Sequence, residues 1–167
     1  PLKIPSKLQR ISDYTFSKCI SLSEIKIPGN IREIGYKSFS GCSGLREISI
    51  PSTVKTVGIG AFENCTELKD ISLPTTLTEI NYYTFSGCTS LTTLTLHSKL
   101  TAINNYAFAG CKSLTEIHCK NSNPPLIGEN TFRDVNRIGC KIFVPSKRAK
   151  KSYSTALYWN EFTIYIE

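Results

Sequence analysis

Cysteine is the residue type in this sequence best suited to chemistry, because a thiolate is both a nucleophile and a metal ligand. Five of the seven cysteines recur at a constant step, since 42 − 19 = 65 − 42 = 23. Equivalent side chains of stacked units lie about 5 Å apart and parallel, whereas a disulfide needs converging Cβ atoms about 3.8 Å apart. We therefore expect free, buried thiols that behave as small apolar residues. The five are Cys19, Cys42, Cys65, Cys88 and Cys111.

The other two cysteines, Cys119 and Cys140, lie outside that series. When CKIFVP is aligned with the earlier strands, these two thiols fall four strand positions apart, or about 13 Å, which is too far for a disulfide. Zinc is the alternative for the five thiols in series, but ligands on one parallel ladder cannot surround a tetrahedral ion. We expect seven free thiols, no metal site and no cofactor.

The remaining acid–base groups are few. His97 and His118 are the two histidines, and the repeat is expected to place the carboxylates in a row on one exposed face. Catalysis requires a nucleophile or an acid–base pair that converges in a concave site. The row of carboxylates could instead bind calcium. Calcium takes six or more oxygen ligands, however, and carboxylates from one side of the ion rarely supply that many. The sequence favours a protein that is not an enzyme.

The cysteine spacing belongs to a repeat that runs through most of the chain. Phenylalanine keeps the same step, since 62 − 39 = 85 − 62 = 23, and so do several leucine and isoleucine columns. One such unit buries too little apolar surface to offset the entropy of ordering it. We therefore expect a solenoid of stacked 23-residue rungs. The phenylalanine column is Phe16, Phe39, Phe62, Phe85 and Phe108.

Each rung is expected to hold one short strand and a compact return. Ile48 and Ile50 alternate with polar residues, which predicts a strand with one buried face, and Pro51 ends it. Val57 turns inward again, and Gly58 permits a bend. Stacked rungs pair these strands in parallel, so the predicted fold is a β-rich coil with short parallel strands.

Residues 1–119 are expected to form the repeat array, and residues 120–167 a small α/β capping segment of the same domain. Leu2 and Ile4 align with strand positions one period later, so we expect the array to be cropped at its N-terminus. An export signal is then expected upstream of residue 1. The apolar N-terminal end could also associate end to end with a second copy.

The capping segment is different in character from the rungs. Ser146 is expected to cap a short helix over Lys147–Ala156, with Tyr153, Ala156 and Leu157 on its packed side and basic residues on the other. A last alternating strand is expected over 163–166. The basic run is most simply the solvated side of this helix, and attraction to an acidic partner is the alternative.

Composition excludes several classes of function. The chain has 167 residues, 40% apolar content and a net charge of +7 that is spread along its length. Nucleic-acid-binding proteins concentrate basic and aromatic residues on one face, so we expect no nucleic-acid partner. No apolar run approaches the roughly 20 residues of a membrane span, so we expect no integral membrane segment here.

The repeat resembles the BspA-like class of leucine-rich repeats, whose unit reads roughly LxxIxIPxxVxxIGxxAFxxC, over residues 1–119. Asn81 and Asn104 depart from it by replacing the glycine of that unit. The resemblance implies a right-handed, curved leucine-rich repeat solenoid, exposure on a bacterial surface or secretion, and adhesion or host interaction without catalytic residues. The ending is similar to that of such proteins from oral and gut bacteria in Val144, Pro145, Tyr153, Ala156, Trp159 and Phe162.

Exposed strand residues of a solenoid align in columns, so a partner would meet stripes rather than a pocket. Toward the C-terminus these columns bring ring systems to a small polar surface, as interfaces do. The alternative is an ordinary solvated face whose charges compensate one another. The candidate face comprises Thr93, Thr95, Glu116, His118, Lys141 and Phe143.

A second candidate is a ridge formed by Tyr14, Tyr83 and Tyr106, with Tyr36 and Tyr82 one position earlier. These rings could pack partly across neighbouring rungs and keep their hydroxyls in water. They could also form a ridge that binds a sugar or a protein.

Two functions are consistent with these features. The first is a non-catalytic binding module of a cell-surface or secreted protein, with an extracellular protein or glycan as its partner. The second is a structural spacer in a larger exported protein. Uniform, charge-balanced columns would favour the spacer, whereas the change toward Thr, His and Phe near the cap favours the binding module.

Overall fold

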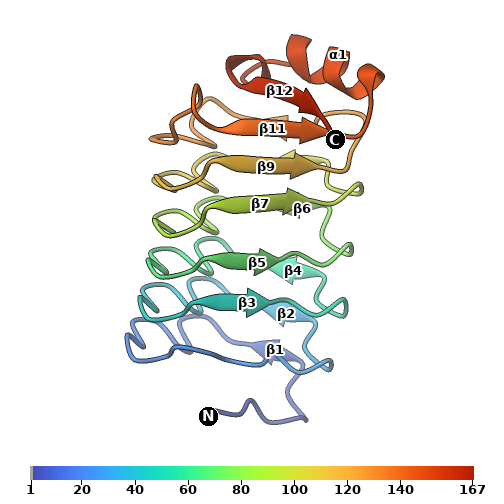
Figure 1. Ribbon diagram of the computed structural model, residues 1–167. Helices are drawn as coiled ribbons and strands as arrows, with labels where there is room; N and C mark the ends of the chain where they lie inside the picture. The colour runs from blue at the N-terminus through green and yellow to red at the C-terminus, as the bar shows by residue number, and fades with distance from the viewer. Residues whose placement is uncertain (1) are drawn as a thin grey trace.

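The chain folds as a parallel β-solenoid, in which strands of successive coils lie side by side (Figure 1). The computed structural model describes residues 2–167. The longer strands form one ladder, here called the strand face, and they pair at the predicted step: Glu47 pairs with Asp70, and Thr93 pairs with Glu116. Its strands are β3 (Glu47–Ser49), β5 (Asp70–Ser72), β7 (Thr93–Leu96), β9 (Glu116–Cys119), β11 (Lys141–Val144) and β12 (Thr163–Ile166).

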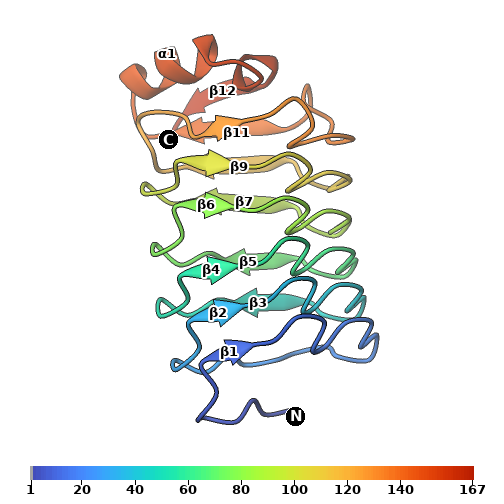
Figure 2. The ribbon, with the colours of Figure 1, turned by 180° about the vertical axis from the view of Figure 1, so that it is seen from behind.

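A second ladder of two-residue strands runs along the back of the coils (Figure 2). The sequence predicted only an inward turn at this point, and Val57 is indeed buried. Two residues are too few for an alternating pattern to show, so the sequence did not reveal these strands. They are β1 (Arg10–Ile11), β2 (Glu33–Ile34), β4 (Thr56–Val57), β6 (Glu79–Ile80), β8 (Ala102–Ile103) and β10 (Leu126–Ile127).

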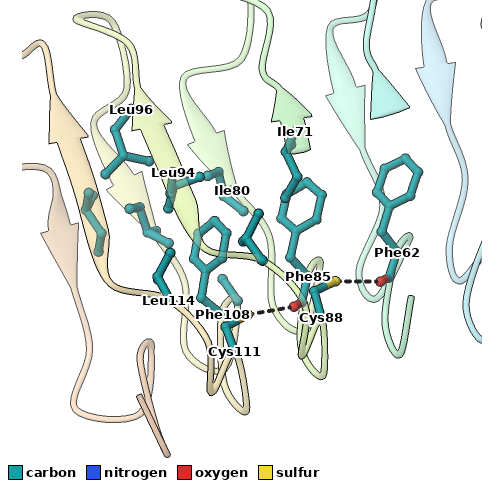
Figure 3. Packing of buried hydrophobic residues seen from close by; sticks show 14 of the residues in the cluster. Phe62, Ile71, Ile80, Phe85, Cys88, Leu94, Leu96, Phe108, Cys111 and Leu114 are labelled. Atoms are coloured by element: carbon teal, nitrogen blue, oxygen red, sulfur yellow. Dashed lines mark hydrogen bonds between the residues drawn. The ribbon is translucent and has the colours of Figure 1, made fainter. Parts of the chain in front are cut away.

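Stacked phenylalanine rings run through the core from coil to coil (Figure 3). Phe39, Phe62, Phe85 and Phe108 are at most 1% exposed, and neighbouring ring centroids in the stack lie 5.0 to 5.6 Å apart. Phe132 continues the stack although it arrives one residue late, since 132 − 108 = 24. Burying each ring contributes about 2–3 kcal/mol, so this column is a major source of stability.

The cysteines lie beside the rings and link consecutive coils. Cys88 Sγ donates to the carbonyl oxygen of Phe62 at 3.4 Å, and Cys111 Sγ donates to that of Phe85 at 3.3 Å (Figure 3). All seven thiols are free, as predicted. The prediction of burial was wrong for Cys19, which is exposed and lies in the first of the described coils, at the end of the thiol column.

Both ladders are interrupted around the coil that contains β5 and β6. Within residues 2–167, β5 pairs with β3 but not β7, and β6 pairs with β8 but not β4. In the preceding coil the Gly58 N–H donates to the Ile34 carbonyl at 2.8 Å. A Cβ on Gly58 would lie 2.6 Å from the Gly35 carbonyl carbon, so this close approach requires glycine. Asn81, one coil later, donates its side-chain amide to the Val57 carbonyl at 2.8 Å instead.

The capping helix forms as predicted, over α1 (Lys147–Thr155). Ser146 caps it, because its Oγ accepts from the Ala149 N–H at 3.1 Å. Tyr153 is buried against the coils, as expected. The placement of Leu157 on the packed side was wrong: its side chain is 70% exposed, because the helix ends at Thr155.

The C-terminal end of the strand face is completed by β12. A 3₁₀ helix, η1 (Trp159–Glu161), leads into this strand. The Trp159 indole is buried and donates to the Pro125 carbonyl at 2.8 Å. β12 pairs in parallel with β11 and places Tyr165 opposite Phe143. The chain therefore adds one more strand, and one more aromatic ring, to the candidate face.

Candidate binding face

The strand face brings together all six residues of the first candidate site. Pairing of β7, β9 and β11 places them in two adjacent columns that lie across three neighbouring strands. None of the six belongs to the buried core. The first column is Thr93, Glu116 and Lys141, and the second is Thr95, His118 and Phe143.

The second column is a ladder of rings, which we call the ring ladder: His118, Phe143 and Tyr165. The His118 and Phe143 rings stack with centroids 4.9 Å apart and planes at 11°. Phe143 and Tyr165 follow at 5.6 Å and 31°. Tyr165 is 41% exposed and His118 and Phe143 are half-buried, so the ladder meets solvent along its length.

Sequence reasoning missed Tyr165. The signal was present, because the last strand was expected to alternate, and pairing it with β11 at matching positions would have placed Tyr165 beside Phe143. The sequence does not contain another repeat unit in this region, so it gave no register for that pairing.

A network of charges borders the ring ladder. Glu167 accepts a hydrogen bond from Lys120 Nζ at 2.5 Å and also contacts His118 Nδ1. Glu116 Oε2 lies 3.7 Å from His118 Nε2. The hydrogen bond from Lys120, followed by that from His118, lowers the pKa of Glu167 below its ordinary value. These contacts hold the imidazole between two carboxylates and keep its ring flat against Phe143.

The N-terminal half of the strand face has a different character. A groove of about 750 Å³ runs over it, and it contains the carboxylates of Glu24, Glu47 and Asp70. Its walls also include apolar residues of the first coils, such as Ile25 and Ile48. Lys3 and Lys26 also line this groove, so the two halves of the face differ in chemistry: charges of both signs and apolar residues at one end, and aromatic rings at the other.

The tyrosine ridge is only partly assembled as the sequence suggested. Tyr83 and Tyr106 stack with centroids 4.8 Å apart and planes at 1°. Tyr14 packs edge-on against Tyr36 at 5.2 Å and 82°, which is a separate contact. The hydrogen bond with Tyr36 is the main reason that the pKa of Tyr14 is raised. The ridge is thus two pairs of rings.

Among residues 2–167, no group of three or more His, Cys, Asp or Glu side chains is placed to hold a metal ion. In the same part of the chain, no hydroxyl or thiol hydrogen-bonds to His118, which touches two carboxylates. No helix of the described chain has the length and apolar character to cross a membrane.

Comparison with solved structures supports the same fold. A leucine-rich repeat protein from Bacteroides ovatus is 26% identical with a TM-score of 0.66, over 98% of this chain and 44% of that one. A leucine-rich cell surface protein from Faecalibacterium prausnitzii is 27% identical with a TM-score of 0.68, over 92% and 37%. The leucine-rich repeat protein of T. pallidum is 29% identical with a TM-score of 0.66, over 70% and 57%.

The chain spans less than two thirds of the length of each of these three proteins. Among curated proteins, none matches it in sequence. The family model described as the BspA type leucine-rich repeat region matches in six copies, over residues 1–115 and 37–160. These matches span most of the chain and agree with the observed repeat of strands, rings and thiols. The chain belongs to the BspA-type leucine-rich repeat family.

Proposed function

We propose that the protein is a non-catalytic binding module of a cell-surface or secreted bacterial protein, and that it binds an extracellular protein or glycan through the C-terminal half of its strand face. The observation that carries the proposal is the ring ladder of His118, Phe143 and Tyr165 on a rigid sheet. The description of the F. prausnitzii relative as a cell surface protein supports the location.

Physical reasons favour this surface over the rest of the face. Aromatic side chains dominate the binding energy of interfaces, because they bury a large area at a small cost in conformational entropy. Here the rings are held by strand pairing and by the Glu167 contacts, so little order has to be gained on binding. The flanking Glu116 and Lys141 can supply a polar rim of both signs.

The test is binding of the isolated protein to arrays of glycans and extracellular-matrix proteins. A Glu116→Ala, His118→Ala, Phe143→Ala variant should lose a specific signal while its melting temperature stays close to that of the wild type. A Glu47→Ala, Ser49→Ala variant is the matched control, because its residues occupy the same two columns on β3. A folded protein that binds nothing on either array would favour the structural spacer instead.

A further inference from the structure

Exposed aromatic and apolar residues also gather on the turns behind the strand face, far from the ring ladder in chain position. The cluster lies where the chain leaves the second ladder, after β1, β2, β4 and β6 (Figure 2). Among residues 2–167, it contributes five of the thirteen large hydrophobic side chains that are exposed. They are Tyr14 at 55%, Tyr36 at 37%, Ile59 at 40%, Tyr82 at 44% and Tyr83 at 38%.

The backbone at these turns is unfavourable for tyrosine. One position of each turn is left-handed, with φ of 57° at Tyr14, 59° at Tyr83 and 64° at Tyr106. Gly60 occupies the same position with φ of 63° and shows that glycine fits it. A bulky L-residue in this region costs about 1 kcal/mol or more relative to glycine. The backbone conformation at these three positions is therefore less favourable for tyrosine than for glycine.

Glycine at position 60 leaves one face of the Tyr83 ring without an aromatic neighbour. Tyr83 stacks on Tyr106 on one side, and the next equivalent position on the other side is Gly60, which has no side chain. A Cβ built there would lie 3.1 Å from Lys37 Cγ and 3.4 Å from Glu63 Oε2. The Lys37 side chain therefore occupies this position, and its Nζ lies 3.1 Å from Glu63 Oε2.

A groove of about 340 Å³ with both polar and apolar lining residues opens beside the cluster on the same side. Tyr36 and Ile59 form part of its wall, and Arg10, Asp13 and Glu33 give it hydrogen-bonding groups. The Arg10 guanidinium bonds Asp13 at 2.8 Å and Glu33 at 3.1 Å, so these charges largely compensate one another. The groove therefore offers donors and acceptors of both kinds, without a free cation to attract an anion.

We propose that this cluster and its groove form a second binding site, for a neutral polysaccharide chain. A pyranose ring has apolar C–H faces that pack on an aromatic ring, and hydroxyls at its edge that both donate and accept hydrogen bonds. The exposed rings of Tyr36, Tyr82 and Tyr83 match the first property. The paired groups of the groove and the Lys37–Glu63 pair match the second.

The site is independent of the strand face, so it can exist whether or not the ring ladder binds anything. Charged peptides are a weaker fit, because the ionic groups of the groove and of the Lys37–Glu63 pair are already engaged with one another. Binding of a protein by the same tyrosines is the competing outcome, and the experiment separates the two.

The test is affinity electrophoresis in native acidic gels that contain dextran, laminarin, yeast mannan or soluble starch. At least one of these should retard the protein, and Tyr83→Gly should weaken the retardation at least tenfold. Glycine is favoured at φ of 59°, so this variant removes the ring without destabilising the turn. Tyr82→Ser should also weaken the retardation. Leu157→Ser, which changes an exposed apolar residue of the capping segment outside both proposed sites, should migrate as the wild type does.

Three results would overturn the proposal. The first is that none of the four polysaccharides retards the folded protein. The second is retardation that Tyr83→Gly and Tyr82→Ser leave unchanged. The third is binding of a matrix protein that these two variants abolish while every polysaccharide is ignored, which would make the cluster a protein-binding site.

Discussion

Raising the pH above about 9 should destabilise this fold through its buried thiols. Cys111 and Cys119 are fully buried, and burial raises the pKa of each from the ordinary 9.0 to about 12. Below pH 9 both thiols are protonated in the folded and the unfolded chain, so their contribution to stability is complete. Between pH 9 and 12 only the unfolded chain releases these protons. The free energy of unfolding then falls by about 1.4 kcal/mol per thiol and pH unit.

The perturbation is the double variant Cys111→Ala, Cys119→Ala. At about pH 10.5 the two thiols together should lower the free energy of unfolding of the wild type by about 4 kcal/mol. The variant lacks both thiols, so this part of the loss should be absent from it. Urea unfolding at about pH 8 and pH 10.5, followed by the fluorescence of the buried Trp159, measures both changes. Tyrosine and lysine also titrate in this pH range, but they do so in both proteins. Subtracting the loss of unfolding free energy in the variant from that in the wild type therefore removes their contribution.

Cys19→Ala is the matched control, because that thiol is exposed and its removal leaves both buried thiols in place. The native protein should also react with a thiol reagent at Cys19 far faster than at the buried thiols. Equal losses of stability in the wild type and the double variant would falsify the reasoning, and so would rapid reaction of all seven thiols in the native state.

Three further substitutions test the packing. Phe85→Ala removes a ring that is stacked on both sides and should cost about 3–5 kcal/mol in urea unfolding, and a loss below about 1 kcal/mol would contradict the role of the stack. Gly58→Ala places a Cβ 2.6 Å from the Gly35 carbonyl carbon and should cost about 1–3 kcal/mol, whereas an unchanged melting temperature would show that the coils can separate freely. Ser146→Ala should cost about 1 kcal/mol by removing the helix cap, and Ser146→Thr should retain most of it.

Much of the solenoid is predictable because each structural position occurs once in every repeat unit, so the sequence shows its residue preference several times. The pairing of Glu47 with Asp70 and of Glu116 with Lys141 follows directly from aligning the units. The helix cap at Ser146 was equally predictable, since the signal is local. These features depend on spacing and on short-range hydrogen bonds, which the sequence contains.

Features that depend on how neighbouring coils settle against each other were not predictable. Asn81 and Asn104 replace the same glycine, yet the Asn104 N–H keeps its backbone bond to Ile80 at 2.9 Å, whereas the ladder is interrupted at Asn81. One difference is the neighbour: Asn81 packs on a coil with Gly58, and Asn104 packs on a coil that already carries asparagine. The pattern of residue types in one repeat unit does not indicate how a residue packs against its neighbour in the preceding coil.

The candidate face was predictable to the extent that it lies in the repeat. His118 and Phe143 were expected in one column, and they stack. Tyr165 and Glu167 lie beyond the last repeat unit, and they reach the face only because β12 pairs with β11. The contact of Glu167 with His118 joins residues 49 positions apart, which no local signal indicates.

The most direct test of the central claim, that the ring ladder is a binding surface, is array binding by a Phe143→Ala, Tyr165→Ala variant. Both substitutions remove exposed or half-buried rings and leave the charge network of Glu167 in place. We predict that this variant loses at least tenfold in affinity for any specific glycan or matrix-protein ligand, whereas the Glu47→Ala, Ser49→Ala control retains it. Wild-type affinity in the folded ring variant would contradict the account.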